Sequence, residues 1–428
     1  MGVFIRARLR HRIANAAVLG ALALAAFAAH SAGALSLEDA IRAAGERSPA
    51  VLAAQSRLAA ARHEVGPAGE LPDPRLALGL DNVPTSGVDR FTIDRDSMSA
   101  FRVELMQELP NRDKREARVE LALAEVDRAD AQRRLAGATA RREAAMAWLR
   151  RHSVERQLSL FDGLFKENAL FAEAVRARLA GGSGSAADTV TPRQELARLS
   201  DRRDALLAGK ARAIAALRQW IGDAAEAPLD GTVPGFLISR EVLAASLEVR
   251  PEVIVYQAAA RSMDAEIRAA ESAKKPDWGV ALAYQRRGQG FGDMVMVEFS
   301  FDLPIFSAQR QDPRIAARRA QRAGVDAERS AVLRERRQGL ESALAEYERV
   351  GQAHRRARDV LLPLAIEKAD LTLAGYRGGT VELGDVIAAR QERIEAQLRV
   401  IELEGELLVA AAELRFGFGT SEILEQAK

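Results

Sequence analysis

The sequence contains no cysteine and few aromatic or histidine residues. Of its 428 residues none is Cys, 5% are aromatic and five are His. The absence of Cys excludes a disulfide framework, a thiolate metal site and a lipid anchor attached to Cys. The low aromatic content argues against thick globular cores. Ala, Leu, Arg and Glu dominate the central stretches instead, a composition that is typical of long helices.

The N-terminal segment accounts for the excess of positive charge. Four Arg within residues 1–12 precede an apolar run over 13–29, and a small-x-small site follows at 32–34. This pattern predicts a secretory signal peptide over residues 1–34, with a membrane anchor as the alternative. Without these four Arg the chain has 58 basic and 60 acidic residues, which gives no support for a nucleic-acid partner. No later apolar run is long enough to predict a helical membrane span.

The chain contains the same sequence unit twice. Three groups of residues recur downstream at offsets of 202, 194 and 197 positions. The first residues of these groups are Pro49, Val103 and Gly181, which recur as Pro251, Val297 and Gly378. Nearly equal offsets indicate a tandem duplication in which the order of elements is kept and loop lengths differ. We assign the first repeat to residues 35–230, the second to 231–420 and a tail to 421–428.

Each repeat contains two segments with the period of a β-strand. Apolar residues alternate with other residues over 76–80 and 101–105, and again over 278–284 and 295–301. This alternation predicts strands with one apolar and one polar face. Strands of about ten residues cross a bilayer when they are tilted. Transitions between these strands and the neighbouring helices are expected at four prolines: Pro74, Pro110, Pro276 and Pro304.

Long helical segments surround the strand pairs. The first repeat opens with an Ala-rich helix over about 37–65 that Pro49 interrupts or kinks. Residues 113–180 have a helical period and would extend about 100 Å as one helix. Two segments have the apolar spacing of a coiled-coil-like seam. The first seam consists of Val154, Leu158, Phe161, Phe165, Ala172, Val175 and Leu179, and Asn168 occupies its one polar position. The second seam consists of Ile394, Leu398, Ile401, Leu408 and Ala412.

Glycine pairs follow the long helices. Gly181 and Gly182 in the first repeat, and Gly378 and Gly379 in the second, predict tight reversals of the chain. Two interpretations stay open. The glycines only end the helices, or they also present a docking surface for a partner protein.

An acidic residue marks the start of each helix that follows a glycine pair. Asp188 and Asp385 occupy these equivalent positions. One interpretation is capping of a helix N-terminus, which contributes about 1 kcal/mol at each site. The other is an acidic ring at the entrance of a pore, because rings of carboxylates favour cations. Both roles are compatible.

Four amphipathic strands do not close a barrel by themselves. The smallest membrane barrels have eight strands, and lipid does not tolerate open sheet edges. Long helices with narrow apolar seams also bury little surface alone. We therefore predict that several copies share one barrel and one helical tube.

No arrangement of residues indicates catalysis. His63, His152 and His354 lie far apart on predicted helices and lack the spacing of a zinc motif. Met294 and Met296 share a strand face, where plain barrel residues are a better interpretation than soft-metal ligands. The Gly-rich segment at 288–292 joins two strands and does not open a helix. We expect no enzymatic activity, no cofactor and no metal site.

The twofold order of helix, strand pair, long helix, turn and helix resembles the TolC family of outer-membrane efflux channels over residues 35–420. The most specific marks are the paired segments 181–195 and 378–392, with Pro110 and Pro304. This resemblance implies a mainly α fold in which a homotrimer forms a helical tunnel in the periplasm. It also implies a shared 12-stranded β-barrel in outer-membrane lipid, with four strands from each protomer. The implied partners are a periplasmic adaptor (membrane fusion) protein and an inner-membrane RND pump.

A narrower resemblance is to the heavy-metal-efflux branch of CzcC-like proteins. It rests on the segments at 71–74, 81–84 and 106–111, followed by Lys114 and Arg115. It implies a passive exit duct for heavy-metal cations. A multidrug or type I secretion channel of the same fold is the alternative, and a soluble periplasmic coiled-coil scaffold is the alternative from another class.

Overall fold

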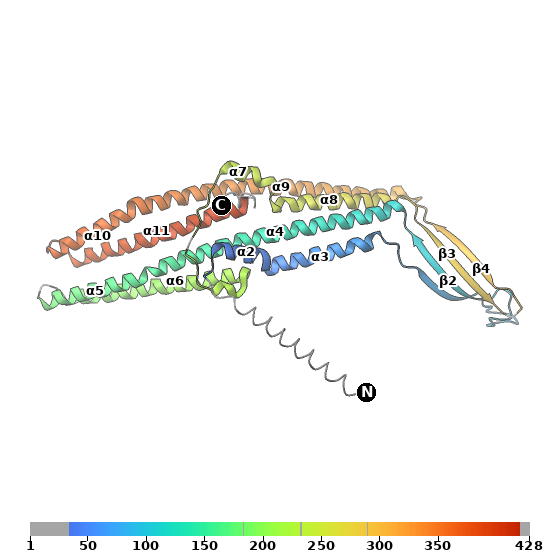
Figure 1. The fold of residues 1–428 in the computed structure, drawn as a ribbon, viewed down its shortest axis with the longest axis horizontal. Helices are drawn as coiled ribbons and strands as arrows, with labels where there is room; N and C mark the ends of the chain where they lie inside the picture. The colour runs from blue at the N-terminus through green and yellow to red at the C-terminus, as the bar shows by residue number, and fades with distance from the viewer. Residues whose placement is uncertain (1–33, 183, 232, 289, 420–428) are drawn as a thin grey trace, which may run out of the picture. The chain divides into compact units, whose positions relative to one another are not determined.

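A computed structural model describes residues 34–182, 184–231, 233–288 and 290–419 (Figure 1). The predicted signal peptide, apart from Ala34, and the predicted tail at 421–428 lie outside these residues. The chain divides into two compact units, which we describe separately. Unit 1 comprises Met1–Ala44, Glu143–Phe236 and Val350–Val409, and unit 2 comprises Gly45–Arg142, Leu237–Arg349 and Ala410–Lys428.

The order of elements repeats as the sequence predicts. The first repeat contains α2 (Leu37–Arg47), α3 (Pro49–Gly69), β1 (Arg75–Asp81), β2 (Ala100–Leu109), α4 (Arg112–Ser159), α5 (Phe161–Ala180), η1 (Ala186–Val190), α6 (Thr191–Ile221) and η2 (Gly222–Glu226). The second contains α7 (Arg240–Ser246), η3 (Leu247–Val249), α8 (Pro251–Ser272), β3 (Trp278–Arg287), β4 (Met294–Phe301), α9 (Ser307–Arg356), η4 (Ala357–Leu361), α10 (Leu362–Arg377) and α11 (Leu383–Phe418). Each compact unit takes segments from both repeats, and the repeat boundary at 230/231 stays a prediction.

Breaks in the helices fall at three points. Pro49 is the first residue of α3 and separates it from α2, because Pro fits the first turn of a helix but not its interior. The single helix considered over 113–180 is in fact two helices, α4 and α5, that meet at Leu160. The Leu160 N–H donates to the carbonyl of Gln157, which tightens the chain there. In the second repeat the π-helical segment η4 separates α9 from α10.

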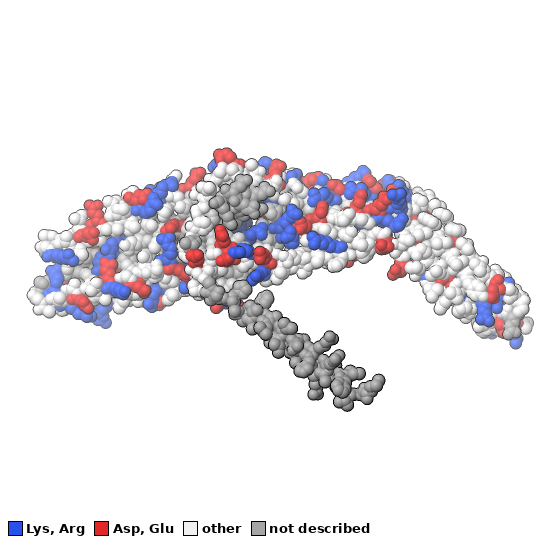
Figure 2. Space-filling view, in the orientation of Figure 1, with Lys and Arg blue, Asp and Glu red and all other residues white. Residues whose placement is uncertain are grey.

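The four strands form one antiparallel sheet in unit 2, in the order β1-β2-β3-β4. Side chains alternate between its faces as predicted. One face carries the cross-strand row Leu76, Leu105, Leu282 and Val297. These four apolar side chains are exposed, with fractions from 50% to 65%. Over the strands the surface of the sheet is mostly uncharged in Figure 2, and charged residues gather at its loop end.

The opposite face of the sheet is polar around Arg102. Its guanidinium pairs with Glu104 at 2.6 Å and with Asp81 at 3.2 Å. Ala281 and Ala283 lie on the same face and are both buried. Both edge strands, β1 and β4, pair on one side only among the described residues.

The core of unit 1 lies between its helical hairpins. It consists of two clusters: Phe161, Leu164, Leu199, Ile394 and Leu398, and Val350, Ala357 and Leu403. Ile394 and Leu398 of the predicted seam are buried here. Ile401 and Leu408 are only half-buried, and the buried face of α11 passes through Leu403 instead.

A second set of contacts in unit 1 holds Leu35 and the end of η2 against α4. Trp148 is fully buried, and its indole N–H donates to the Leu35 carbonyl at 3.0 Å. His152 stacks on Trp148 with ring centroids 5.2 Å apart. Arg151 donates to the carbonyls of Ala225 and Ala227 at 2.5 and 2.9 Å. His152 is thus a buried packing residue.

The core of unit 2 beyond the sheet joins α7 and η3 to α9 and α11. Its buried residues are Leu243, Leu247, Leu340, Leu344, Leu414 and Phe418. The Ser246 hydroxyl donates to the Phe418 carbonyl at 2.6 Å and satisfies one free carbonyl at the end of α11.

Candidate functional site

The four predicted transition prolines all lie between strands and helices. Pro74 directly precedes β1, and Pro276 lies two residues before β3. Pro110 lies between β2 and α4, and Pro304 between β4 and α9. Pro has no N–H to donate to a neighbouring strand, so strand pairing stops at these positions. There the backbone changes between strand and helix.

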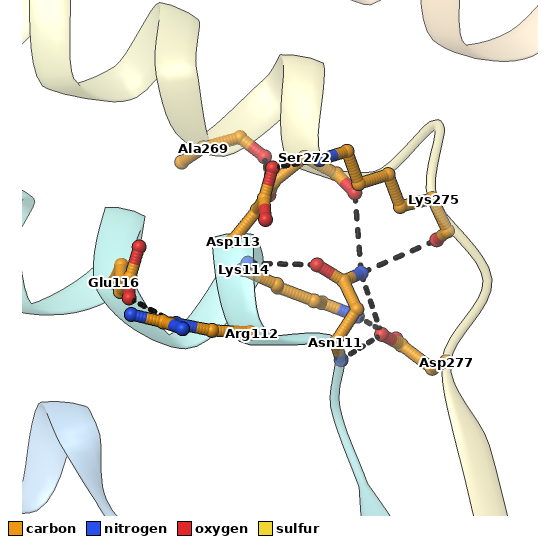
Figure 3. Close-up of polar contacts among 9 residues, drawn as sticks. All are labelled: Asn111, Arg112, Asp113, Lys114, Glu116, Ala269, Ser272, Lys275 and Asp277. Atoms are coloured by element: carbon orange, nitrogen blue, oxygen red, sulfur yellow. Dashed lines mark hydrogen bonds and ion pairs between the residues drawn. The ribbon is translucent and has the colours of Figure 1, made fainter.

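Beside Pro110, a polar joint connects the start of α4 to the segment that leads into β3 (Figure 3). The Asn111 backbone N–H and side-chain amide both donate to one Asp277 carboxylate oxygen, at 2.7 and 2.9 Å. The same amide donates to the carbonyls of Ser272 and Lys275 at 3.2 Å. The Asn111 side-chain oxygen caps α4 by accepting from the Lys114 N–H at 2.8 Å.

The charges at this joint are paired. Lys114 forms an ion pair with Asp277, and Lys275 forms one with Asp113. Burial opposes ionisation of Asp277, but hydrogen bonds from Lys114 and Asn111 outweigh it and lower the pKa of this carboxyl. The joint therefore contains an ionised Asp277. It holds the connection between β2 and α4 against the connection between α8 and β3.

The two glycine pairs form equivalent reversals in unit 1. Gly182 and Gly379 have φ angles of 75° and 76°, in the left-handed region that other residues adopt at a cost. The preceding glycines, Gly181 and Gly378, donate their N–H groups to Ala177 and Ala374, each at 3.0 Å. All four glycines are exposed. We call residues 176–190 and 374–388 the two tips.

The structure also joins the two tips to each other. The Arg178 guanidinium carbon lies 4.0 Å from the Tyr376 ring centroid, and its Nη1 donates to the Tyr376 carbonyl at 3.3 Å. Further along the hairpins, Gln391 donates to Glu195 at 2.6 Å, and Glu167 pairs with both Arg390 and Arg393. Gln391 lies in the segment 378–392 and Glu195 in its repeat 181–195, so the duplicated segments contact each other.

The two tip aspartates have different surroundings. The half-buried Asp188 accepts from the Ser185 backbone N–H at 2.9 Å and forms a capping box at the start of η1. Asp385 lies exposed in the first turn of α11, where the helix dipole favours a negative charge. No described contact joins the two carboxylates.

Sequence reasoning missed two polar residues of these contacts, Asp277 and Arg178. The segment that contains Asn111 and Lys114 was identified, but their partner Asp277 lies 166 positions from Asn111. Lys275-Pro276-Asp277 before a predicted strand was the available signal. Arg178 precedes the first glycine pair and Tyr376 precedes the second, so the repeat itself was the signal for their contact.

Among the described residues there is no group of three or more His, Asp or Glu that suits a metal ion. No described helix combines the length and apolar character that a membrane span requires.

Comparisons with known proteins agree with this fold. Residues 40–223 match the family model described as outer membrane efflux protein. No curated protein sequence matches the chain. A membrane protein of Pseudomonas aeruginosa superposes with a TM-score of 0.76 at 18% identity, over 90% of this chain and 93% of that chain.

Two further solved structures have the same fold. The outer membrane protein VceC of Vibrio cholerae gives a TM-score of 0.71 at 17% identity, over 90% of this chain and 96% of that one. The Campylobacter jejuni CmeC outer membrane channel gives 0.73 at 12% identity, over 92% and 89% of the two chains. The chain therefore has the fold of these solved outer-membrane channels, with its own four strands in one sheet, and residues 40–223 match the model of the outer membrane efflux protein family.

Proposed function

We propose that this chain is the outer-membrane exit duct of a tripartite efflux pump and works as a homotrimer. The observation that carries the proposal is the four-stranded sheet, which has an exposed apolar face, a polar face and two unpaired edges among the described residues. In lipid each unpaired backbone group costs several kcal/mol, so such a sheet needs further strands at both edges.

Pairing β1 of one copy with β4 of the next removes both edges. Three copies then supply 12 strands, well above the minimum of eight for a membrane barrel. The row that contains Leu76, Leu105 and Val297 would face lipid. Arg102, Glu104 and Asp81 would face the interior and line it with paired charges.

The tips are the proposed docking surface for the periplasmic adaptor protein. The exposed pairs Gly181–Gly182 and Gly378–Gly379 support this role. A cavity of about 270 Å³ beside the first tip, between α5 and α6, also supports it. In this cavity Asn168 is 4% exposed; its amide donates to the Pro192 carbonyl at 3.0 Å, and its side-chain oxygen has no partner among the described residues. An incoming N–H donor of the adaptor would satisfy that oxygen.

We further propose that Asp188 and Asp385 contribute to an acidic ring at the periplasmic entrance. Asp385 is exposed and has no described hydrogen-bond partner, so its charge is available to a passing cation. In planar bilayers, Asp385→Asn is expected to lower the preference for cations over anions. Asp188→Asn is expected to change selectivity less and tip stability more, because Asp188 caps η1. Unchanged selectivity in both variants would leave capping as the only role.

The proposed cargo is heavy-metal cations. The support is the resemblance of the segments at 71–74, 81–84 and 106–111 to CzcC-like proteins. The fold itself is shared by ducts with different cargo, because the inner-membrane pump selects the substrate. The test must therefore distinguish a duct for heavy-metal cations from the alternative, a multidrug duct.

Deletion of the gene in its native host tests the function. We expect a fall in the inhibitory concentration of heavy-metal salts, restored by the wild-type gene, with little change for a panel of drugs. Sensitivity to drugs alone would assign the duct to a multidrug pump. Unchanged resistance to both, in a strain that normally expresses the protein, would contradict a role in efflux.

A further inference from the structure

Unit 2 contains a basic cavity whose lining residues belong neither to the joint nor to the sheet. It has a volume of about 270 Å³ and is bordered by α2, α3, α4, α8 and α11. Among the described residues its lining contains five arginines and no acidic residue: Arg133, Arg134, Arg141, Arg250 and Arg415. Apolar side chains complete the lining, among them Val51, Ile254 and Phe416.

Three of these arginines are held in place by neighbouring groups. Arg133 and Arg134 both pair with Asp130, at 2.8 and 2.6 Å. Arg250 donates to the carbonyls of Phe416 and Gly419 and so caps the end of α11. Arg250 also forms an ion pair with Glu252 at 3.4 Å. Asp130, in contrast, offers one carboxylate to the two guanidinium groups of Arg133 and Arg134.

Arg141 has no hydrogen bond or ion pair with any residue in the described part of the chain, although it is half-buried. A Cβ atom at Gly45 would lie 3.0 Å from Arg141 Cγ and Nη1, and one at Gly137 would lie 3.4 Å from Nη1. Two glycines therefore leave the space that the Arg141 side chain occupies. Burial lowers the pKa of Arg141, and the charges of Arg250 and Arg133 lower it further.

A half-buried cation among like charges is unfavourable unless an anion compensates it. Guanidinium groups bind phosphate through paired, charge-assisted hydrogen bonds, and several of them match its several acceptor oxygens. We propose that this cavity binds a phosphate group, free or esterified, and that Arg141 is its main ligand. The proposal is independent of the exit-duct function.

The size and the apolar part of the lining limit the ligand. Pockets for drug-sized ligands hold about 300–1,000 Å³, and this cavity lies just below that range. It therefore suits a small phosphate compound. Val51, Ile254 and Phe416 would contact the carbon part of an ester, as in a lipid headgroup with its first methylene groups, whereas free phosphate would leave them unused.

Thermal unfolding of the purified, detergent-solubilised protein in phosphate-free buffer tests the site. The two probes are inorganic phosphate and dihexanoyl phosphatidylglycerol below its micelle-forming concentration. We expect a saturable rise in Tm with at least one probe, because a ligand that binds only the folded state stabilises it. Arg141→Gln should weaken binding at least tenfold, and Arg141→Lys less, because Lys keeps the charge but loses the planar fork.

Arg128→Gln is the matched control. Arg128 is also on α4, pairs with Glu125 and does not line the cavity. Its substitution should leave the midpoint of the phosphate titration unchanged. Equal weakening by Arg128→Gln and Arg141→Gln would show a general effect of charge and overturn the proposal. If Arg141→Gln does not fold, Arg141→Lys provides the same comparison.

The two probes also identify the source of the phosphate group. Tighter binding of the short-chain lipid indicates an ester, and equal or tighter binding of inorganic phosphate indicates the free ion; each supports the site. No saturable effect of either probe on the wild-type protein would overturn it.

Discussion

Arg178 and Tyr376 connect the two repeats at their tips. The guanidinium lies 4.0 Å from the ring centroid and donates to the carbonyl of the same tyrosine. Each residue precedes the glycine pair of its own repeat, at Gly181 and at Gly378. The contact therefore ties one reversal to the other within unit 1, and the relative position of the two reversals depends on it.

A double-mutant cycle measures this contact. Cation–π pairs contribute about 0.5–1 kcal/mol at exposed sites. We expect Arg178→Met and Tyr376→Leu to show a coupling free energy of that size when opening of the tips is measured by hydrogen exchange of 374–379. Arg176→Met, on the same helix, is the control and should show no coupling with Tyr376→Leu. Additive effects of the Arg178 and Tyr376 variants would mean that the stacking does not stabilise the tips.

The second glycine of each pair should be the most sensitive tip position. Gly182→Ala and Gly379→Ala place a side chain at positive φ, which costs about 1–2 kcal/mol. An added Cβ meets no atom within 4 Å at either position, so the cost is in the backbone alone. Gly384→Ala, in the first turn of α11, also meets no atom but lacks a positive φ. Urea unfolding should show the first two variants destabilised and Gly384→Ala unchanged or stabilised.

Adjacent residues of β4 separate the two faces of the sheet. Val297 lies on the apolar face and Met296 on the opposite face, and both are exposed. We expect Val297→Lys to destabilise the membrane-inserted protein by about 2–4 kcal/mol, because the charge would face lipid. Met296→Lys is the matched control and should insert normally. Folding into lipid vesicles, followed by tryptophan fluorescence, gives the comparison. Equal effects of the two variants would contradict the assignment of the faces.

The joint at Asp277 should show a pH dependence of defined sign. Its pKa is lowered in the folded protein, so the stability that it contributes is present above the unfolded pKa of about 3.9 and is lost as the pH falls through the folded value. At pH 7, Asp277→Asn should be less stable than wild type, since Lys114 loses its charged partner. The difference should shrink as the pH falls below about 4. A difference that stays constant over this range would assign it to packing.

The strands and the helix-to-strand transitions were predictable because their signals are local. Apolar residues alternate with other residues at 76–80 and 295–301, and prolines lie near these segments. This pattern predicts strands there without knowledge of the rest of the fold. The predicted join at Pro49 is confirmed for the same reason, since a proline starts α3 there. The order of elements followed from the duplication.

The remaining features depend on contacts between distant segments. Asp277 reaches Asn111 across 166 positions, and neither residue has a pattern that names the other. The break at Leu160 contains neither Pro nor Gly and so had no local signal. The seam of α11 was misplaced at Ile401 because a strict heptad drifts from a helical period of 3.6, and the partners of Leu403 on α9 and η4 determine which side is buried.

The central claim is that copies of the chain close the sheet into one membrane barrel. Native mass spectrometry of the protein extracted from outer membranes in detergent tests it most directly. We expect a particle of three chains that does not dissociate on dilution. In this particle β1 of one copy pairs with β4 of the next. Cys residues introduced at Leu78 and at Val297 should then form disulfides between copies. A stable monomer, with no disulfide between copies at any register of β1 and β4, would contradict it.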